Sequence, residues 1–184
     1  ENIRETLKSN GCNAVLYSGL DEVAWLFNIR GNDVSFNPVA IAYAFVDDKQ
    51  TYLFIPQQKI TQEVASQLAA DGIAIYDYSK INDFLANLPK ETILALDFNR
   101  INFSLYAKAT CQKRNLPSAV IDAKSIKNET ELQGIRSAMV RDGVAMVRFL
   151  YWLTRAMELN TRLTEMDIAE ELLSFRKDQP YFMG

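Results

Sequence analysis

Hydrophobic residues in the first 125 positions fall into short apolar runs separated by segments with helical spacing. The runs are rich in β-branched and aromatic residues and are bounded by Gly, Pro or paired acids, which is typical of strands. The turn residues Asp47-Asp48-Lys49 separate two of the runs and predict a hairpin there. The pattern predicts strands at 12–18, 39–46, 50–55, 73–78, 92–97 and 118–122.

Segments with helical spacing fill the gaps between these strands. Apolar residues recur every three or four positions, so we expect helices at 21–28, 60–69, 81–88 and 103–114. In 21–28 the apolar residues lie nearly all round, so we expect that helix and its Trp25 to be deeply buried. Strands that alternate with helices, together with one hairpin, predict an α/β fold: a mixed sheet of about five to six strands with helices on both faces.

The pattern changes after Lys124. Asn128 followed by Glu131 is typical of a capping box, and apolar residues then recur about every 3.5 positions, which predicts one helix over 129–159. Such a helix would be roughly 45 Å long. Thr164 with Asp167 predicts the start of a second helix by the same capping logic.

The long predicted helix carries a second apolar stripe. Its members make the apolar face wider than one partner helix would cover: Val140, Val144, Val147 and Tyr151. Two interpretations are open. The face packs against the amino-terminal sheet, or part of it belongs to a domain outside this chain.

Net charge and hydropathy limit the classes of partner that this chain is expected to bind. The formal net charge of −3 offers no basic excess for phosphate backbones, so we expect no nucleic-acid partner. The longest apolar run, 39–46, is far shorter than the roughly 18 residues of a membrane-spanning helix, and no signal-peptide pattern opens the chain. We expect no membrane attachment. The first residue is Glu1 rather than Met, which indicates a fragment or a processed product.

The chain has no histidine. A Ser/His/Asp triad, a Cys/His pair and a His-ligated metal are therefore excluded within these residues. Cys12 and Cys111 lie far apart in sequence, and we expect two buried, reduced thiols of a cytoplasmic protein rather than zinc ligands. Catalysis by this chain alone would have to rest on carboxylates, lysine or tyrosine.

Carboxylates occur as adjacent pairs at 21–22, 47–48 and 170–171. Neighbours on a strand point to opposite faces and neighbours on a helix lie about 100° apart, so these pairs do not predict an active site. Asp97 and Asp122, at predicted strand ends, could serve a ribonuclease H-type nuclease, but the strand at 12–18 offers no acid to join them. No glycine-rich phosphate loop is present.

The predicted helix at 21–27 runs into a polar loop that carries Asn28, Arg30, Asn32, Asp33 and Asn37. Such a density of hydrogen-bonding groups beside an apolar helix is typical of a recognition loop. The alternative is a helix C-cap over 28–31 with Arg30 paired to Asp33 at the surface. Composition alone favours the cap.

Residues 20–31, with Asp33, Asn37 and Pro38, resemble the signature of the middle domain of the three-domain Xaa-Pro aminopeptidases (aminopeptidase P). Residues 123–128 before Glu129 resemble the junction to the catalytic domain of that family. The resemblance covers essentially the whole chain. It implies that 1–125 form a creatinase-N-terminal-like domain of ribonuclease H-like fold. Residues 126–184 would be the linker and first two helices of a truncated pita-bread catalytic domain.

The resemblance implies that the parent enzyme hydrolyses the bond between an amino-terminal residue and a following proline. Family members use two divalent metals, usually manganese, held by two Asp, one His and two Glu, and all of these ligands would lie beyond Gly184. The resemblance therefore assigns this chain no catalytic residue and no metal ligand. It implies a cytoplasmic parent, a homodimer, that acts on proline-containing peptides.

Within such a parent, this piece would be a non-catalytic structural and substrate-gating domain. Asn28, Arg30 and Asp33 are its expected substrate-binding residues. Asp33 would pair with the peptide ammonium, Asn28 would accept a hydrogen bond from it, and Arg30 would orient Asp33 or bridge domains. The alternative is a stand-alone α/β binding or nuclease-like module.

Overall fold

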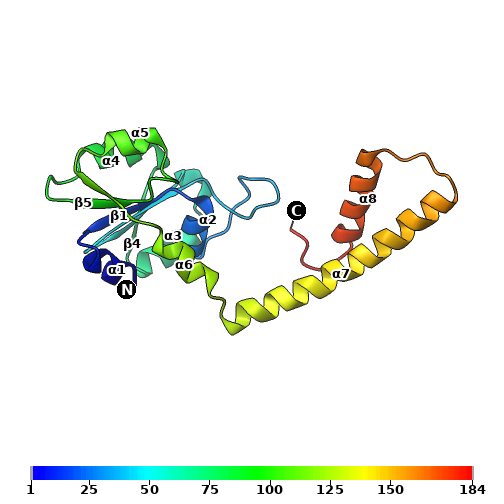
Figure 1. Cartoon of the computed structure of the whole chain (residues 1–184). Helices are drawn as coiled ribbons and strands as arrows, with labels where there is room; N and C mark the ends of the chain where they lie inside the picture. The colour runs from blue at the N-terminus through cyan, green and yellow to red at the C-terminus, as the bar shows by residue number, and fades with distance from the viewer. Residues whose placement is uncertain (1, 184) are drawn as a thin grey trace. The chain divides into compact units, whose positions relative to one another are not determined.

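The computed structural model describes residues 2–183 and divides into two compact units, Glu1–Ser125 and Ile126–Gly184. The first unit contains the sheet and the second contains two helices (Figure 1). Each unit has its own internal packing and is described by itself.

The first unit is built on one mixed six-stranded sheet in the order β4-β3-β2-β1-β5-β6. β1 pairs antiparallel with β2, and β2 pairs antiparallel with β3, so the predicted hairpin is confirmed. The other three pairings are parallel. The strands are β1 (Ala14–Tyr17), β2 (Tyr43–Asp47), β3 (Thr51–Phe54), β4 (Ile73–Tyr76), β5 (Ile93–Leu96) and β6 (Gln112–Asn115).

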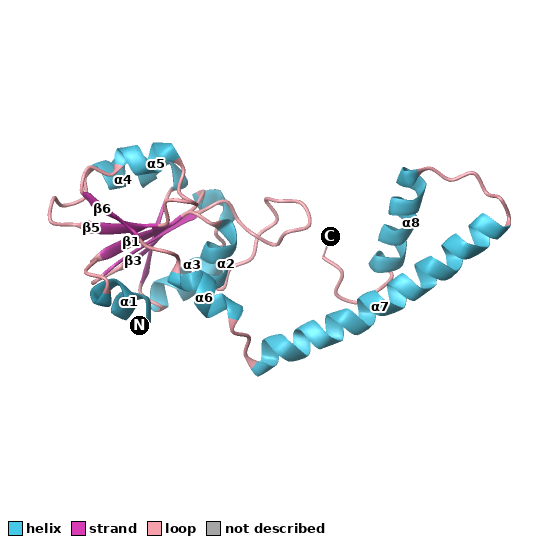
Figure 2. Ribbon diagram, viewed as in Figure 1, coloured by secondary structure: helices cyan, strands magenta, loops and turns pink. Residues whose placement is uncertain are grey.

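Helices cover both faces of the sheet (Figures 1 and 2). Side chains of β1 alternate between two buried clusters: Val15 and Tyr17 join one, and Ala14 and Leu16 join the other. The first cluster includes residues of α1 (Asn2–Ser9), α2 (Leu20–Leu26), α3 (Gln62–Ala70) and α6 (Ala119–Ser125). The second includes residues of α4 (Ile81–Ala86) and α5 (Phe103–Lys108). The predicted mixed sheet with helices on both faces is confirmed.

Two elements differ from the prediction at the carboxyl end of this unit. The helix expected over 103–114 ends at Lys108, and the chain continues into β6. β6 is a polar edge strand whose side chains are mostly exposed, so its sequence carries no apolar alternation to identify it. The strand expected at 118–122 is wrong, because these residues begin α6. A short apolar run alone does not distinguish a strand from a helix.

Two smaller differences concern the first half of the chain. α1 was not predicted. In the run at 39–46, only the part from Tyr43 onward pairs as β2, whereas Val39 and Ala40 are buried at the end of a loop. The turns η1 (Gln57–Lys59) and η2 (Tyr78–Lys80) follow β3 and β4.

The second unit consists of α7 (Glu129–Glu158) and α8 (Glu165–Lys177), as the spacing predicted. Asn128 with Glu131 and Thr164 with Asp167 form the two expected capping boxes. The helices pack against each other, and Arg176 Nε on α8 donates to Asp142 Oδ1 on α7 at 2.8 Å.

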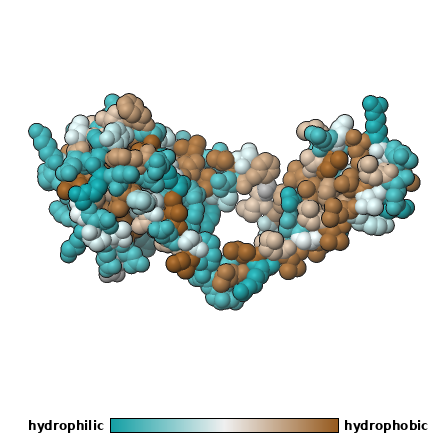
Figure 3. Space-filling view, viewed as in Figure 1, coloured by the Kyte–Doolittle hydropathy of each residue, from teal (hydrophilic) through white to brown (hydrophobic). Residues whose placement is uncertain are grey.

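α8 covers only part of the apolar surface of α7. Hydrophobic side chains gather over this unit in the space-filling view (Figure 3). Val140, Val147 and Tyr151 are 69%, 68% and 70% exposed, so most of the second predicted stripe faces outward. No helix within residues 2–183 is both long and apolar enough to cross a bilayer.

Candidate functional site

The carboxyl end of α2 starts the polar loop. Ile29 N donates to Ala24 O at 3.1 Å, and Asn28 N donates to Trp25 O at 3.3 Å, which is a Schellman-type ending. Asn28 lies at the left-handed position with φ 50°, a conformation that Asn tolerates better than most residues. The predicted C-cap is therefore present. The expectation for Trp25 is wrong in degree: it is half-buried and packs against the core cluster from its edge.

The loop after the cap is a narrow finger that is pinched at its base. Gly31 N donates to Pro38 O at 3.3 Å, and Asp33 N donates to Val39 O at 3.2 Å. A Cβ at position 31 would lie 2.9 Å from Ala40 Cβ and 3.0 Å from its backbone N. Gly31 is required here by the close approach of two backbone segments.

The tip of the finger carries an exposed aromatic side chain. Phe36 is 78% exposed and has φ 62°, which is unusual for a bulky residue. Asn37 N donates to Val34 O at 3.2 Å and closes the tip. Sequence reasoning considered only the polar residues of this segment and missed Phe36. A lone aromatic between Ser35 and Asn37 is the signal that could have found it.

Arg30 and Asp33 do not form the surface ion pair expected for the cap alternative. Arg30 Nη1 donates to Ile29 O at 2.9 Å and to Ala24 O at 3.2 Å, so its positive charge lies at the carboxyl end of α2. A cation is favourable there, since the last carbonyl groups of a helix carry partial negative charge. Asp33 has other partners, from a distant part of the chain.

The Asp33 carboxylate ties the finger to the sheet domain. One oxygen accepts from Ile41 N at 2.7 Å, and the other forms an ion pair with Lys59 in η1. The hydrogen bond from Lys59, and then that from the Ile41 amide, hold the pKa of Asp33 below its ordinary value. Lys59 was missed in the sequence because it lies far from Asp33 along the chain.

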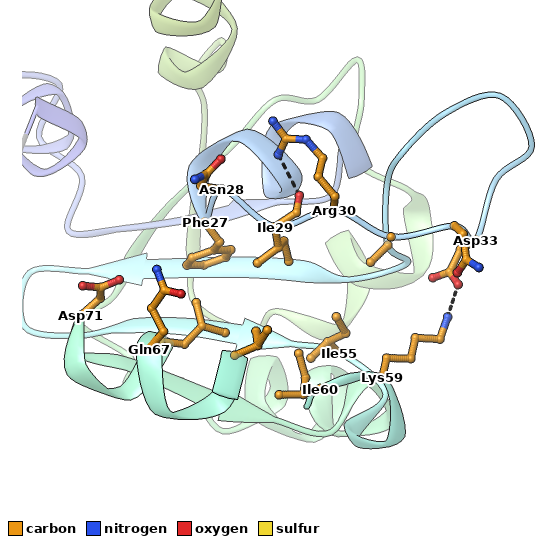
Figure 4. A pocket seen from close by; sticks show the side chains of 15 residues that line it. Phe27, Asn28, Ile29, Arg30, Asp33, Ile55, Lys59, Ile60, Gln67 and Asp71 are labelled. Atoms are coloured by element: carbon orange, nitrogen blue, oxygen red, sulfur yellow. Dashed lines mark hydrogen bonds and ion pairs between the residues drawn. The ribbon is translucent and has the colours of Figure 1, made fainter. Parts of the chain in front are cut away.

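A cavity of about 510 Å³ opens beside the base of the finger, between the end of α2 and α3 (Figure 4). Its buried floor includes Phe27, Ile55 and Leu68, which are 8%, 2% and 3% exposed. Asn28, Arg30 and Asp33 are all among its lining residues, and the Arg30 side chain turns away from it toward the end of α2. Asn37 is not among its lining residues.

The acids considered for catalysis lie apart. Asp122 lies on α6 rather than at a strand end, so the proposed partnership with Asp97 loses its basis. Asp97 Oδ1 accepts from Asn99 N at 3.0 Å in the turn after β5. Across residues 2–183, no three His, Cys, Asp or Glu side chains gather closely enough to hold a metal ion.

The acid pair at the start of α2 has a structural role. Asp21 forms ion pairs with Lys124 on α6 and, at 3.6 Å, with Arg100 Nη2. Glu22 is buried, and its Oε2 lies 3.7 Å from Arg100 Nε. The Lys124 hydrogen bond, followed by its charge, lowers the pKa of Asp21 against the opposing effect of burial. These contacts fix the helix that carries the finger.

Both cysteines are free and buried, as expected. Cys12 and Cys111 are 6% and 7% exposed. Burial raises the pKa of both thiols, which keeps them protonated and unreactive.

The fold and the finger coincide with a known domain. Residues 1–131 match the family described as the creatinase/prolidase N-terminal domain. The chain belongs to this family. The resemblance drawn from residues 20–38 is thereby confirmed at the level of the domain, together with its α/β fold.

Curated proteins similar to this chain include Xaa-Pro aminopeptidases. The probable Xaa-Pro aminopeptidase P of Neurospora crassa is 36% identical over 195 residues, which cover 100% of this chain and 28% of that protein. Xaa-Pro aminopeptidase 1 of Dictyostelium discoideum is 36% identical over 186 residues, covering 99% of this chain and 30% of that protein. The chain thus spans under a third of these relatives.

Solved structures of two peptidases are similar to this chain. The X-prolyl aminopeptidase of Caenorhabditis elegans, described as a cytosolic enzyme with a di-nuclear active site, superposes with a TM-score of 0.91 at 29% identity. The match covers 99% of this chain and 31% of that one. The Xaa-Pro dipeptidase of Bacillus anthracis, with a TM-score of 0.70 at 15% identity over 95% of this chain and 47% of that one, shares the fold.

Proposed function

We propose that this chain is a non-catalytic, substrate-gating part of a metal-dependent Xaa-Pro aminopeptidase that removes the amino-terminal residue preceding proline. The observation that carries the proposal is the match to the C. elegans enzyme, with a TM-score of 0.91 over 99% of the chain. That match extends through α7 and α8, beyond the residues of the family match. The cytosolic location of that enzyme supports a cytoplasmic parent.

The residues of this chain do not supply a set of ligands that could hold the two divalent metals of such an enzyme. The chain has no histidine, and its acids are scattered or engaged in ion pairs, as Asp21 and Asp33 are. We therefore assign no catalytic step to these residues. We propose that two divalent metals, with manganese the expected species, are held by other residues of the parent.

Asn28 is proposed to bind the peptide through its amide while its backbone caps α2. Its side chain is exposed, and the amide oxygen can accept from a peptide ammonium. Asn28→Gly separates the two roles, because Gly keeps the left-handed cap and removes the amide. We expect this variant of the full-length enzyme to have a lower kcat/KM than wild type and an unchanged free energy of unfolding. Unchanged kcat/KM would leave Asn28 a cap only.

Arg30 is proposed to contact a peptide carbonyl or a neighbouring domain. A guanidinium has five N–H donors, and the two hydrogen bonds to the end of α2 both use Nη1. Those bonds hold the side chain in one orientation, so the other donors are presented without further loss of side-chain entropy. A role of Arg30 in orienting Asp33 has no support, since the two residues have separate partners.

Asp33 is proposed to bind the substrate ammonium with the acceptor capacity that remains to it. A carboxylate has about four lone-pair sites, and the Ile41 amide and Lys59 occupy one on each oxygen. Losing a charge-assisted hydrogen bond costs about 1.5–3 kcal/mol. We therefore expect Asp33→Ala to lower kcat/KM about ten- to a hundred-fold with metal content intact.

Lys59→Met is the matched control for that experiment. It removes the competing cation while leaving the carboxylate, so direct binding by Asp33 predicts kcat/KM at or above the wild-type value. If Asp33 acts only by tying down the finger, Lys59→Met should lower kcat/KM part of the way toward Asp33→Ala, because the hydrogen bond from Ile41 N remains. If Asp33→Ala has the kcat/KM of wild type, Asp33 does not bind the substrate.

The activity itself is tested with the full-length protein. Release of the first residue from Xaa-Pro peptides should require added manganese and should be absent with the 184-residue chain alone. A full-length protein that binds manganese and leaves Xaa-Pro peptides intact would overturn the proposal.

The second unit is proposed to be the start of the catalytic domain. The exposed stripe on α7, with Val140 and Tyr151 among its members, supports this because a large apolar face is normally covered. We expect the 184-residue chain to self-associate in light scattering, and the full-length protein to show one defined oligomer, a homodimer. A strictly monomeric chain at high concentration would contradict the interpretation.

A further inference from the structure

The cavity between α2 and α3 has the size and lining of a ligand site in its own right. Its volume of about 510 Å³ lies within the usual range for small-molecule sites, about 300–1,000 Å³. Its walls belong entirely to the sheet unit, and its apolar lining runs from Phe27 on one side to Ile60, Val64 and Leu68 on the other. Phe27 and the α3 side face each other across it (Figure 4).

The two ends of the cavity differ in charge. At one end, Asp33 and Lys59 neutralise each other across the mouth (Figure 4). At the other end, below Phe27, lie Gln67 on the last turn of α3 and Asp71 at the C-cap of that helix (Figure 4). Within the described part of the chain, the Asp71 carboxylate has neither a hydrogen-bond donor nor an ion-pair partner.

Arg30 and Arg4, which line hollows that Asp71 also lines, hydrogen-bond to other groups. Arg30 points away from the cavity toward the carbonyl groups at the end of α2 (Figure 4). Arg4, which shares a smaller hollow with Asp71, donates to Asp47 O at 2.8 Å and to Thr51 Oγ1 at 3.2 Å. The α3 end of the cavity is therefore apolar, and among residues 2–183 the Asp71 carboxylate at its rim has no direct ion-pair partner.

We propose that this cavity binds small amphiphilic amines, with an apolar body against Phe27 and Leu68 and a primary ammonium at Asp71. The Gln67 amide oxygen is a second acceptor for the ammonium. Free arylalkylamines and the amino-terminal residue of a peptide with an apolar side chain share this chemistry. Asp71 lies at the opposite end of the cavity from Asp33 (Figure 4), so failure of this inference leaves the proposed substrate contact of Asp33 and the peptidase function untouched.

The test is a chemical-shift titration with 2-phenylethylamine of the ¹⁵N-labelled 184-residue chain, at a concentration below that at which light scattering detects self-association. We expect saturable shifts of the Ile29, Ile60 and Leu68 amides with a dissociation constant of roughly 0.1–1 mM. The neutral isostere 2-phenylethanol should bind more weakly, and phenylacetate should not bind. Equal binding of the amine and the alcohol, or no shifts at these amides, would overturn the proposal.

Asp71→Asn tests the charge without disturbing the core, because the residue is exposed. It should weaken binding of the amine about three- to ten-fold, and high salt should weaken wild-type binding similarly. Binding of 2-phenylethanol should stay unchanged. Asp83→Asn is the matched control: it makes the same charge change on α4, outside the cavity. Equal affinities of Asp71→Asn and Asp83→Asn would refute the role of Asp71.

L-Phenylalaninamide distinguishes the two sources of the ligand. If it binds as well as 2-phenylethylamine, the site accepts peptide amino termini. If only the free amine binds, the site is one for small amines. Both results support the assigned chemistry, provided that the Asp71→Asn effect is present.

Discussion

Gly31→Ala tests whether the finger depends on backbone contact at its base. The added methyl would lie 2.9 Å from Ala40 Cβ and 3.0 Å from Ala40 Cα and N. Two of these three atoms are backbone, so the neighbour cannot relieve the contact by changing a rotamer. The methyl must push residues 31 and 40 apart and lengthen the hydrogen bond from Gly31 N to Pro38 O, now 3.3 Å.

The expected magnitude follows from two opposing terms. Overpacking costs about 1–3 kcal/mol. Ala also has less conformational freedom than Gly in the unfolded chain, which offsets about 0.4–1 kcal/mol of that cost. The net expectation is a loss of about 0–2.6 kcal/mol in the free energy of unfolding. The lower part of this range applies if the finger moves outward as a whole.

The assay is urea unfolding followed by the fluorescence of Trp25, which lies in the sheet unit. A Trp152→Phe background leaves Trp25 as the single tryptophan, because the chain has two. Gly143→Ala is the control: it lies on α7 in the other unit, with nothing within 4 Å of an added Cβ. We expect it to leave the Trp25 transition unchanged. A Gly31→Ala midpoint at or above that of Gly143→Ala would refute the reasoning.

Three further outcomes are expected. Gly19→Ala places a methyl on the buried Glu22 carboxylate and should destabilise the sheet unit by about 1–3 kcal/mol; unchanged urea midpoints would contradict this. The hydrogen bond from Lys59 lowers the pKa of Asp33 in the folded protein. The ionised Asp33 carboxylate therefore stabilises the fold fully above pH about 4, and this stabilisation is lost as the pH falls through the pKa of Asp33 in the folded state. The urea midpoint of wild type should therefore drop toward that of Asp33→Asn as the pH is lowered to 3. If the two midpoints keep a constant difference over this pH range, Asp33 does not stabilise the fold through its charge. Asn128→Ala removes the capping box of α7 and should cost about 0.5–2 kcal/mol, read as lost helical circular dichroism on heating; an identical melting curve would argue against it.

Local signals were sufficient for much of the architecture. The capping boxes at Asn128 and Thr164 were readable because each uses two side chains three positions apart. Buried strands such as β1 were readable because both faces are apolar. β6 was not, because an edge strand pairs through its backbone, and its residues Gln112–Asn115 are polar.

The candidate site was predictable only in part. The density of polar groups after α2 marked Asn28, Arg30 and Asp33, and the structure places them around one cavity. Their partners came from the tertiary fold: Lys59 lies in η1, and Arg30 turns back onto the helix that precedes it. The cavity itself is formed by α2 and α3, which no pattern within either segment could reveal.

The pinched base of the finger makes the stability of the domain largely independent of the length of the finger's tip. The hydrogen bonds from Gly31 to Pro38 and from Asp33 to Val39 hold the two ends together whatever lies between them. Closing a longer tip would therefore cost little, since each doubling of loop length adds only about 0.6 kcal/mol of closure entropy. An insertion around Phe36 would therefore lengthen the tip of the finger while leaving the hydrogen bonds at its base, and the sheet they attach to, unchanged.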